Sequence, residues 1–168
     1  MAYAICLRLD AEAEAAVAAI WQKLAGAGIS DDMVRLGYPP HLSLAVLDEE
    51  PDESVVAGAL VDGGAIDCQL GPIGRFEGTD VVWLALAGGA PLMDLHRRVL
   101  ARLPADLVRS HYRVGNWTPH VTLQTTGDAV RAMALADSAW PEARSARLTA
   151  MELVRFPPVA VLESRALG

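Results

Sequence analysis

The sequence predicts an α+β fold built from two related lobes, each a small sheet backed by helices. Three observations lead to this prediction. Short apolar segments of strand length alternate with segments whose apolar residues repeat at helical spacing. A Pro-His string occurs twice, as PPHLSL at residues 39–44 and TPHVTL at residues 118–123. Each string is followed by a helix-like segment and then by two strand-like segments, an order that suggests a repeated unit.

The first half of the chain predicts a strand and helix, then a second strand and helix. Residues 2–9 are short and apolar, and Asp10 is a good N-cap for the helix that follows. Within 11–27, large apolar residues fall at i, i+3, i+4 and i+7, namely Val17, Ile20, Trp21 and Leu24. A strand at 41–47 is followed by a helix at 51–61, which Gly63 and Gly64 end.

The second half predicts five further strands and two helices. Strands at 66–70 and 81–87 flank the turn-rich segment GPIGRFEGTD. Pro91 occupies the expected first position of a helix that carries Leu92, Leu95, Val99 and Leu103. The remaining elements are a strand at 120–125, a helix at 128–139, and strands at 147–156 and 159–165 around Pro157 and Pro158.

Length and composition favour one globular domain, residues 1–168, that contains both lobes. The chain has 168 residues, of which 52% are hydrophobic and 21% charged, unlike a disordered chain. Its formal net charge of −7 disfavours binding of long RNA, whereas a small nucleotide is penalised less.

The sequence also predicts a cytoplasmic location. The first ten residues lack a basic signal region, and the uncharged run at 81–93 is too short to span a membrane and is interrupted by Gly and Pro. Cys6 and Cys68 are isolated and lack metal-ligand spacing, so we expect reduced core residues. The oligomeric state is left open.

The two Pro-His strings each place an imidazole and a hydroxyl on one face of a strand. Because side chains alternate along a strand, His41 and Ser43 point one way while Leu42 and Leu44 point the other. His120 and Thr122 alternate with Val121 and Leu123 in the same manner.

Such a pair suits phosphoryl transfer without a covalent intermediate. One neutral imidazole, of His41 or His120, can take a proton from the attacking oxygen while the other gives one to the leaving oxygen. The hydroxyls of Ser43 and Thr122 can donate to non-bridging phosphoryl oxygens. A metal site is the alternative use of paired histidines, but neither motif supplies further ligands, so we expect no metal or other cofactor.

With these motifs, the sequence resembles the 2H phosphoesterase superfamily, the 2′-5′ RNA ligase-like and cyclic phosphodiesterase proteins. His41-Leu42-Ser43-Leu44 and His120-Val121-Thr122-Leu123 match its two Hx[Ser/Thr]x motifs, and the segment RFEGTDVVWLAL resembles its usual layout. The resemblance implies a bilobal fold with pseudo-twofold symmetry, small antiparallel sheets and an active cleft between the lobes. It also implies metal-independent cleavage of cyclic or 2′-5′ phosphodiesters, with the two histidines as the acid–base pair and the two hydroxyls as phosphate binders.

The activity we expect is hydrolysis of a small 2′,3′-cyclic phosphate or a related 2′-5′ linkage. The alternatives are an RNA 2′-5′ ligase and a module that binds RNA or a nucleotide without turnover. Gln124, where many RNA-directed relatives carry a basic residue, and the acidic charge disfavour long RNA. Tyr38 and Trp117 are candidates for stacking on a base, and Arg113 for contacting a phosphate.

Overall fold

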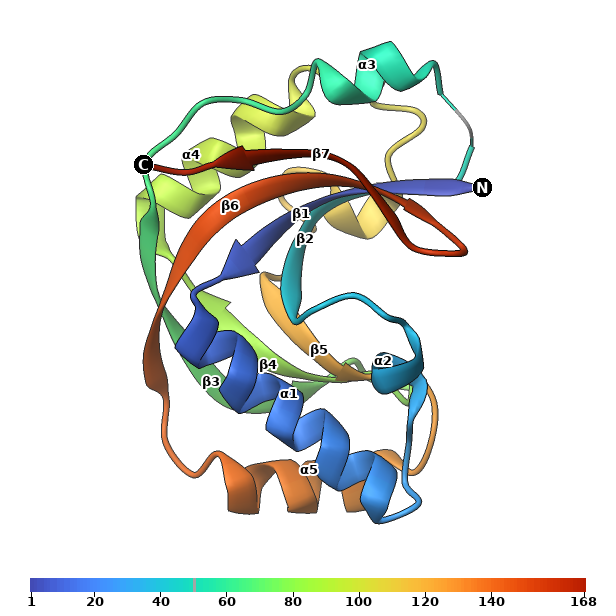
Figure 1. Ribbon diagram of the computed structural model, residues 1–168, viewed down its shortest axis with the longest axis vertical. Coiled ribbons are helices and arrows are strands. Elements are labelled where there is room, and N and C mark those ends of the chain that lie inside the picture. Colours follow the sequence, from blue (N-terminus) through green and yellow to red (C-terminus); the bar gives the residue numbers. More distant parts are fainter. Residues whose placement is uncertain (50) are drawn as a thin grey trace.

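The strands of the protein form one sheet that closes on itself. In the computed structural model, which describes residues 1–49 and 51–168, the strands are β1 (Ala2–Leu9), β2 (His41–Leu47), β3 (Ile66–Arg75), β4 (Val82–Ala87), β5 (His120–Gln124), β6 (Arg144–Phe156) and β7 (Ala160–Ala166). Their order in the sheet is β1-β2-β5-β4-β3-β6-β7, and β1 also pairs with β6. Every pairing is antiparallel. Because β1 pairs with both β2 and β6, six of these strands form a ring, and β7 pairs with β6 outside it (Figure 1).

This architecture confirms the α+β class and corrects the prediction of two separate small sheets. All strands of the described residues belong to one sheet, because β2 pairs with β5 across the middle and β1 with β6 at the closure. Both pairings join segments far apart in the chain, and local apolar patterns do not specify such partners.

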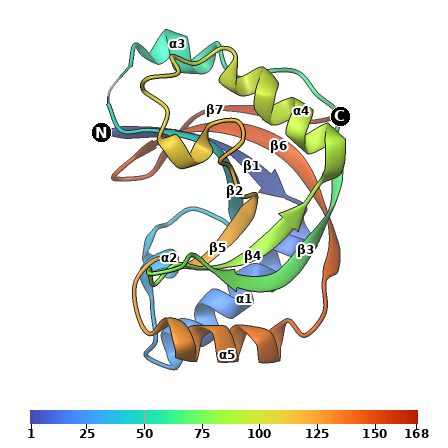
Figure 2. The ribbon, with the colours of Figure 1, turned by 180° about the vertical axis from the view of Figure 1, so that it is seen from behind.

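The helices gather on two opposite sides of this barrel-like sheet (Figures 1 and 2). They are α1 (Ala11–Gly26), α2 (Asp32–Arg35), α3 (Glu53–Ala57), α4 (Gly89–Leu100) and α5 (Ala129–Ala139), with a 3₁₀ turn η1 (Ser110–Tyr112). α1 and α5 lie on one side, and α3 and α4 on the other. The predicted cap is confirmed, because the Asp10 carboxylate accepts from the Ala13 amide at 3.0 Å.

Several element boundaries differ from the sequence prediction. β3 continues through Gly71-Pro72 to Arg75, because a register shift between Leu70 and Ile73 absorbs this pair, which the sequence indicated as a turn. α4 begins two residues before Pro91, which still lies in the first turn, where a missing N–H is tolerated. α3 is shorter than its predicted range, and α2 and η1 were not predicted.

The apolar faces of the two motif strands lie in the hydrophobic core. Leu42, Leu44, Val121 and Leu123 are buried, which confirms the predicted alternation. Cys6 and Cys68 are free and buried, as expected of core residues. Among the described residues, no helix is long and apolar enough to cross a bilayer.

Candidate active site

The two Pro-His motifs lie on neighbouring strands. Leu42 of β2 pairs with Val121 of β5, and both side chains are 0% exposed. In an antiparallel pair of this register, the residue before Leu42 lies beside the residue after Val121. His41 therefore neighbours Thr122, and Ser43 neighbours His120. Each imidazole lies next to the hydroxyl of the other motif, on the face opposite the core.

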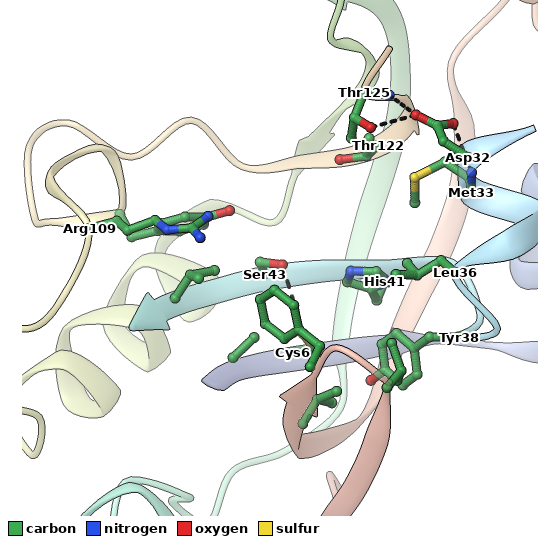
Figure 3. Close-up of a pocket in the computed structure, with 16 residues that line it drawn as sticks. Cys6, Asp32, Met33, Leu36, Tyr38, His41, Ser43, Arg109, Thr122 and Thr125 are labelled. Atoms are coloured by element: carbon green, nitrogen blue, oxygen red, sulfur yellow. Dashed lines mark hydrogen bonds between the residues drawn. The ribbon is translucent and has the colours of Figure 1, made fainter. Parts of the chain in front are cut away.

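A cavity of about 250 Å³ opens on this face. His41 and Ser43 of the first motif and Thr122 of the second line it together, and Figure 3 shows their side chains directed into the same space. His120 alternates onto the same face of β5 as Thr122. Its charge also lowers the pKa of His41, as a nearby group would. The structure thus places all four residues that the motifs predicted on one face of the paired strands, whereas His120 is not among the residues that line the cavity.

Both imidazoles are held by the same local hydrogen bond. His41 Nδ1 lies 2.8 Å from the Pro39 carbonyl oxygen, and His120 Nδ1 lies 2.7 Å from the Thr118 carbonyl oxygen. A carbonyl can only accept, so Nδ1 must carry the proton in each ring. Nε2 is then the nitrogen that gains and loses a proton in both histidines. The proline within each motif separates the histidine from the carbonyl that fixes its ring.

Burial makes both imidazoles weak bases. It lowers the pKa of His41 to about 4, although the hydrogen bond to the Pro39 carbonyl opposes this shift; the positive charges of Arg8 and His120 add to it. Burial also lowers the pKa of His120, against the opposing hydrogen bond to the Thr118 carbonyl. Both rings are therefore neutral near pH 7 in the free protein. A bound phosphate would favour protonation of either ring, because its negative charge stabilises imidazolium.

The surroundings of the two histidines differ in chemistry. His41 packs against Tyr38, with ring centroids 4.7 Å apart, and the Tyr38 hydroxyl donates to Glu152 at 2.6 Å. Glu152 also lies 3.4 Å from the guanidinium of Arg8. Tyr38 lines the cavity, although its side chain is largely buried. The first histidine therefore adjoins a buried network of charged and polar groups.

His120 lies instead in an aromatic corner. Phe76 contacts it edge-on at 5.0 Å between ring centroids, and Trp83 lies 6.0 Å away. Gly74 is required beneath Trp83, because a Cβ there would come within 2.2 Å of the indole ring. Neither aromatic neighbour can act as a charged partner for the imidazole, so the two rings sit in unlike electrostatic settings.

An indole N–H supports the backbone of each motif at its hydroxyl residue. Trp117 Nε1 donates to the Ser43 carbonyl oxygen at 3.2 Å, and Trp21 Nε1 donates to the Thr122 carbonyl oxygen at 3.1 Å. Trp117, a candidate for stacking on a base, is 8% exposed, stacks on His96 at 3.9 Å between ring centroids, and is not among the residues that line the cavity. The sequence showed Trp21 only as part of the apolar stripe of a helix.

The loop before the second motif supplies a different arginine from the one predicted. Arg113 lines a separate groove with Arg97 and Val114, and its Nε donates to the Val108 carbonyl oxygen at 3.1 Å. Arg109, four residues earlier, lines the cavity instead. Both are loop arginines without periodic neighbours, so no pattern in the sequence distinguishes them.

Other reactive groups near the cavity are few in the described part of the chain. Cys6 lies 3.8 Å from the Ser43 hydroxyl, and burial raises the pKa of its thiol to about 12, so the thiol stays protonated. Nowhere in residues 1–49 and 51–168 do three His, Cys, Asp or Glu side chains gather closely enough to hold a metal ion.

Comparison with known proteins agrees with this geometry. The model of the 2′-5′ RNA ligase superfamily matches residues 9–157. No curated protein matches the sequence. E. coli LigT complexed with 3′-AMP aligns over 98% of this chain and 97% of that one, with a TM-score of 0.62 and 19% identity. The LigT complex with NADP+ aligns over 98% and 96%, with a TM-score of 0.61 and 16% identity.

Another solved structure shares the fold as well. The MHV ns2 PDE domain aligns over 99% of this chain and 100% of its own, with a TM-score of 0.57 and 13% identity. At such identities the structural likeness concerns the fold, whereas the family match spans most of the chain and includes both motifs. The chain therefore belongs to the 2′-5′ RNA ligase superfamily, the 2H phosphoesterases that its paired histidine motifs indicated.

Proposed function

We propose that the protein is a metal-independent phosphodiesterase that hydrolyses a small cyclic nucleotide-type phosphodiester. Its substrate carries a 2′,3′-cyclic phosphate or a related 2′-5′ linkage. One observation carries the proposal: the paired strands β2 and β5 place each histidine beside the hydroxyl of the other motif. A phosphorus atom between them could be approached by two imidazoles and two hydroxyl donors at once.

The proposed reaction is an in-line displacement with two proton transfers. Nε2 of one neutral histidine accepts a proton from water as the water oxygen bonds to phosphorus. Nε2–H of the other, protonated histidine gives its proton to the ribose oxygen as the P–O bond breaks, leaving a phosphate monoester. Ser43 and Thr122 donate hydrogen bonds to non-bridging oxygens, where charge accumulates.

Two further observations support a small substrate. The cavity of about 250 Å³ suits a compact ligand, and the net charge of −7 disfavours a long polyanion. LigT, which shares the fold, has been crystallised with 3′-AMP, NADP+, ATP and phosphate. Small phosphate-bearing ligands are therefore the class to test first.

Turnover of defined substrates tests the proposal. The purified protein, with a chelator present, is offered 2′,3′-cyclic mononucleotides and 2′-5′ dinucleotides. We expect hydrolysis that falls by about 10²–10⁴-fold in His41→Ala and in His120→Ala, because each removes one proton transfer. His111→Ala is the matched control, since His111 is exposed and lies outside the cavity lining. Absence of turnover, or equal rates in all three variants, would contradict the proposal.

RNA 2′-5′ ligation is the second candidate, because the matching family is described by that activity. Ligation uses the same phosphorus atom and the same two proton transfers, with a 5′-hydroxyl in place of water as the attacking group and a ribose oxygen of the cyclic phosphate as the leaving group. An assay that joins a 2′,3′-cyclic phosphate end to a 5′-hydroxyl end would favour it. Tight oligonucleotide binding by a protein that is inactive in both assays would favour a binding module instead.

A further inference from the structure

Backbone contacts with β2 hold Arg109 at one end of the cavity. Val108 forms an isolated antiparallel bridge with Leu47, and the Arg109 amide donates to the Val46 carbonyl oxygen at 3.0 Å. Arg109 thus lies beside Val46, three residues beyond Ser43 on β2. At about 3.3 Å per residue, its backbone is about 10 Å along the strand from Ser43. Figure 3 shows its side chain reaching from the loop toward the Ser43 side of the cavity.

Asp48 fixes one edge of the Arg109 guanidinium. Nε donates to the two carboxylate oxygens at 2.9 and 2.8 Å, and Nη2 donates to one of them. The Asp48 side chain is 60% exposed, so this pair holds the guanidinium near the rim. Within the described part of the chain, Nη1 makes no hydrogen bond. A guanidinium has five N–H donors in a planar fork, so the edge away from Asp48 can still bind an anion.

The charges along the cavity single out this arginine. Among the described residues that line it, Arg109 is the one Lys or Arg side chain. Asp32 at the opposite end already accepts from Ser30 and Thr125 and from the amides of Met33 and Thr126. It therefore has little capacity left for a ligand. An anionic group on a bound molecule would be drawn toward Arg109.

We infer that Arg109 binds a second phosphate group of the substrate, separated by one sugar from the phosphate that reacts. This inference rests on the proposed function, in which His41, His120, Ser43 and Thr122 hold the reacting phosphate. Because Asp48 keeps the guanidinium at the rim, Arg109 meets the next anionic group and does not enter the reacting centre. The substrate class is then a nucleoside carrying two phosphates, or a dinucleotide whose linking phosphate takes the second position.

Equilibrium binding separates this inference from catalysis. Calorimetry would compare adenosine 3′-monophosphate, adenosine 3′,5′-bisphosphate and the dinucleotide ApAp on the wild type, Arg109→Gln and Arg113→Gln. We expect the wild type to bind the bisphosphate about 10- to 100-fold more tightly than the monophosphate, as charge-assisted hydrogen bonds allow. Arg109→Gln should lose this preference. Arg113→Gln, changed in the same loop outside the cavity, should keep it.

The outcomes are distinct. Equal affinities of the wild type for monophosphate and bisphosphate, or equal losses in both arginine variants, would overturn the inference even if the protein hydrolyses cyclic phosphates. Failure to bind any of the three ligands would also overturn it. If the wild type prefers the bisphosphate but hydrolyses no cyclic phosphate, the result would support phosphate binding by Arg109 and contradict the proposed phosphodiesterase activity. If the wild type also binds ApAp more tightly than the monophosphate, and Arg109→Gln does not, Arg109 binds a linking phosphate as well.

Discussion

Acidification should destabilise the protein through His41. Its pKa is about 4 in the folded state, whereas an exposed histidine titrates near 6.5. As the pH falls below 6.5, the unfolded chain therefore binds a proton before the folded one does. The stability that depends on a neutral His41 is complete above that pH and is lost progressively toward pH 4. Between pH 7 and pH 5 the loss from this group is about 2 kcal/mol.

Urea unfolding at pH 7 and pH 5 measures this loss. The wild type should lose about 2 kcal/mol more than His41→Asn on acidification, because the variant has no imidazole to protonate. For a chain of this size the difference corresponds to about 4–8 °C in Tm. His111→Asn is the comparison: burial and Arg109 also lower the pKa of this exposed histidine, but less strongly than the pKa of His41, so the variant should stay closer to the wild type than His41→Asn does. If His41→Asn followed the wild type to within about 0.5 kcal/mol, His41 would not be a buried neutral group.

Two further predictions concern the same site. The pH profile of kcat/KM should be bell-shaped with its maximum below pH 6.5, because burial lowers the pKa of both histidines and the reaction needs one neutral and one protonated ring. A maximum at alkaline pH would contradict this. Trp117→Phe and Trp21→Phe should each lower the free energy of unfolding by about 1–3 kcal/mol, since a motif carbonyl loses its indole donor. Chemical denaturation measures this, and losses below about 0.5 kcal/mol would show that the indole bonds do not stabilise the motifs.

Local patterns were sufficient to predict the faces of the two motif strands. The alternation of His41 and Ser43 with Leu42 and Leu44 follows directly from strand geometry, and burial confirms it. The helical stripe of α1 was predicted for the same reason, because its apolar spacing is determined within a few turns.

The pairing of strands that lie far apart in the chain could not be predicted from such local patterns. The sequence does not show that β1 closes the sheet against β6, because many registers would bury the same apolar residues. Trp117 illustrates the same limit at the site. An aromatic residue three positions before a motif histidine can face either the cleft or the core. Trp117 faces the core, where it stacks on His96 of α4, and the local sequence does not show this contact.

The loop arginines show why the candidate site was predicted incompletely. Arg109 and Arg113 differ in no local feature, yet the bridge of Val108 to the end of β2 turns the first toward the cavity. Asp48 then fixes its guanidinium from a separate segment of the chain. Contacts of this kind depend on the folded loop and have no periodic signal.

The convergence of two imidazoles on one phosphorus atom can be observed directly in a crystal structure with inorganic phosphate. We expect one phosphate ion within hydrogen-bond distance of Nε2 of both His41 and His120, with the hydroxyls of Ser43 and Thr122 on its remaining oxygens. A phosphate that contacts only one imidazole, or two phosphates bound at separate histidines, would contradict the account.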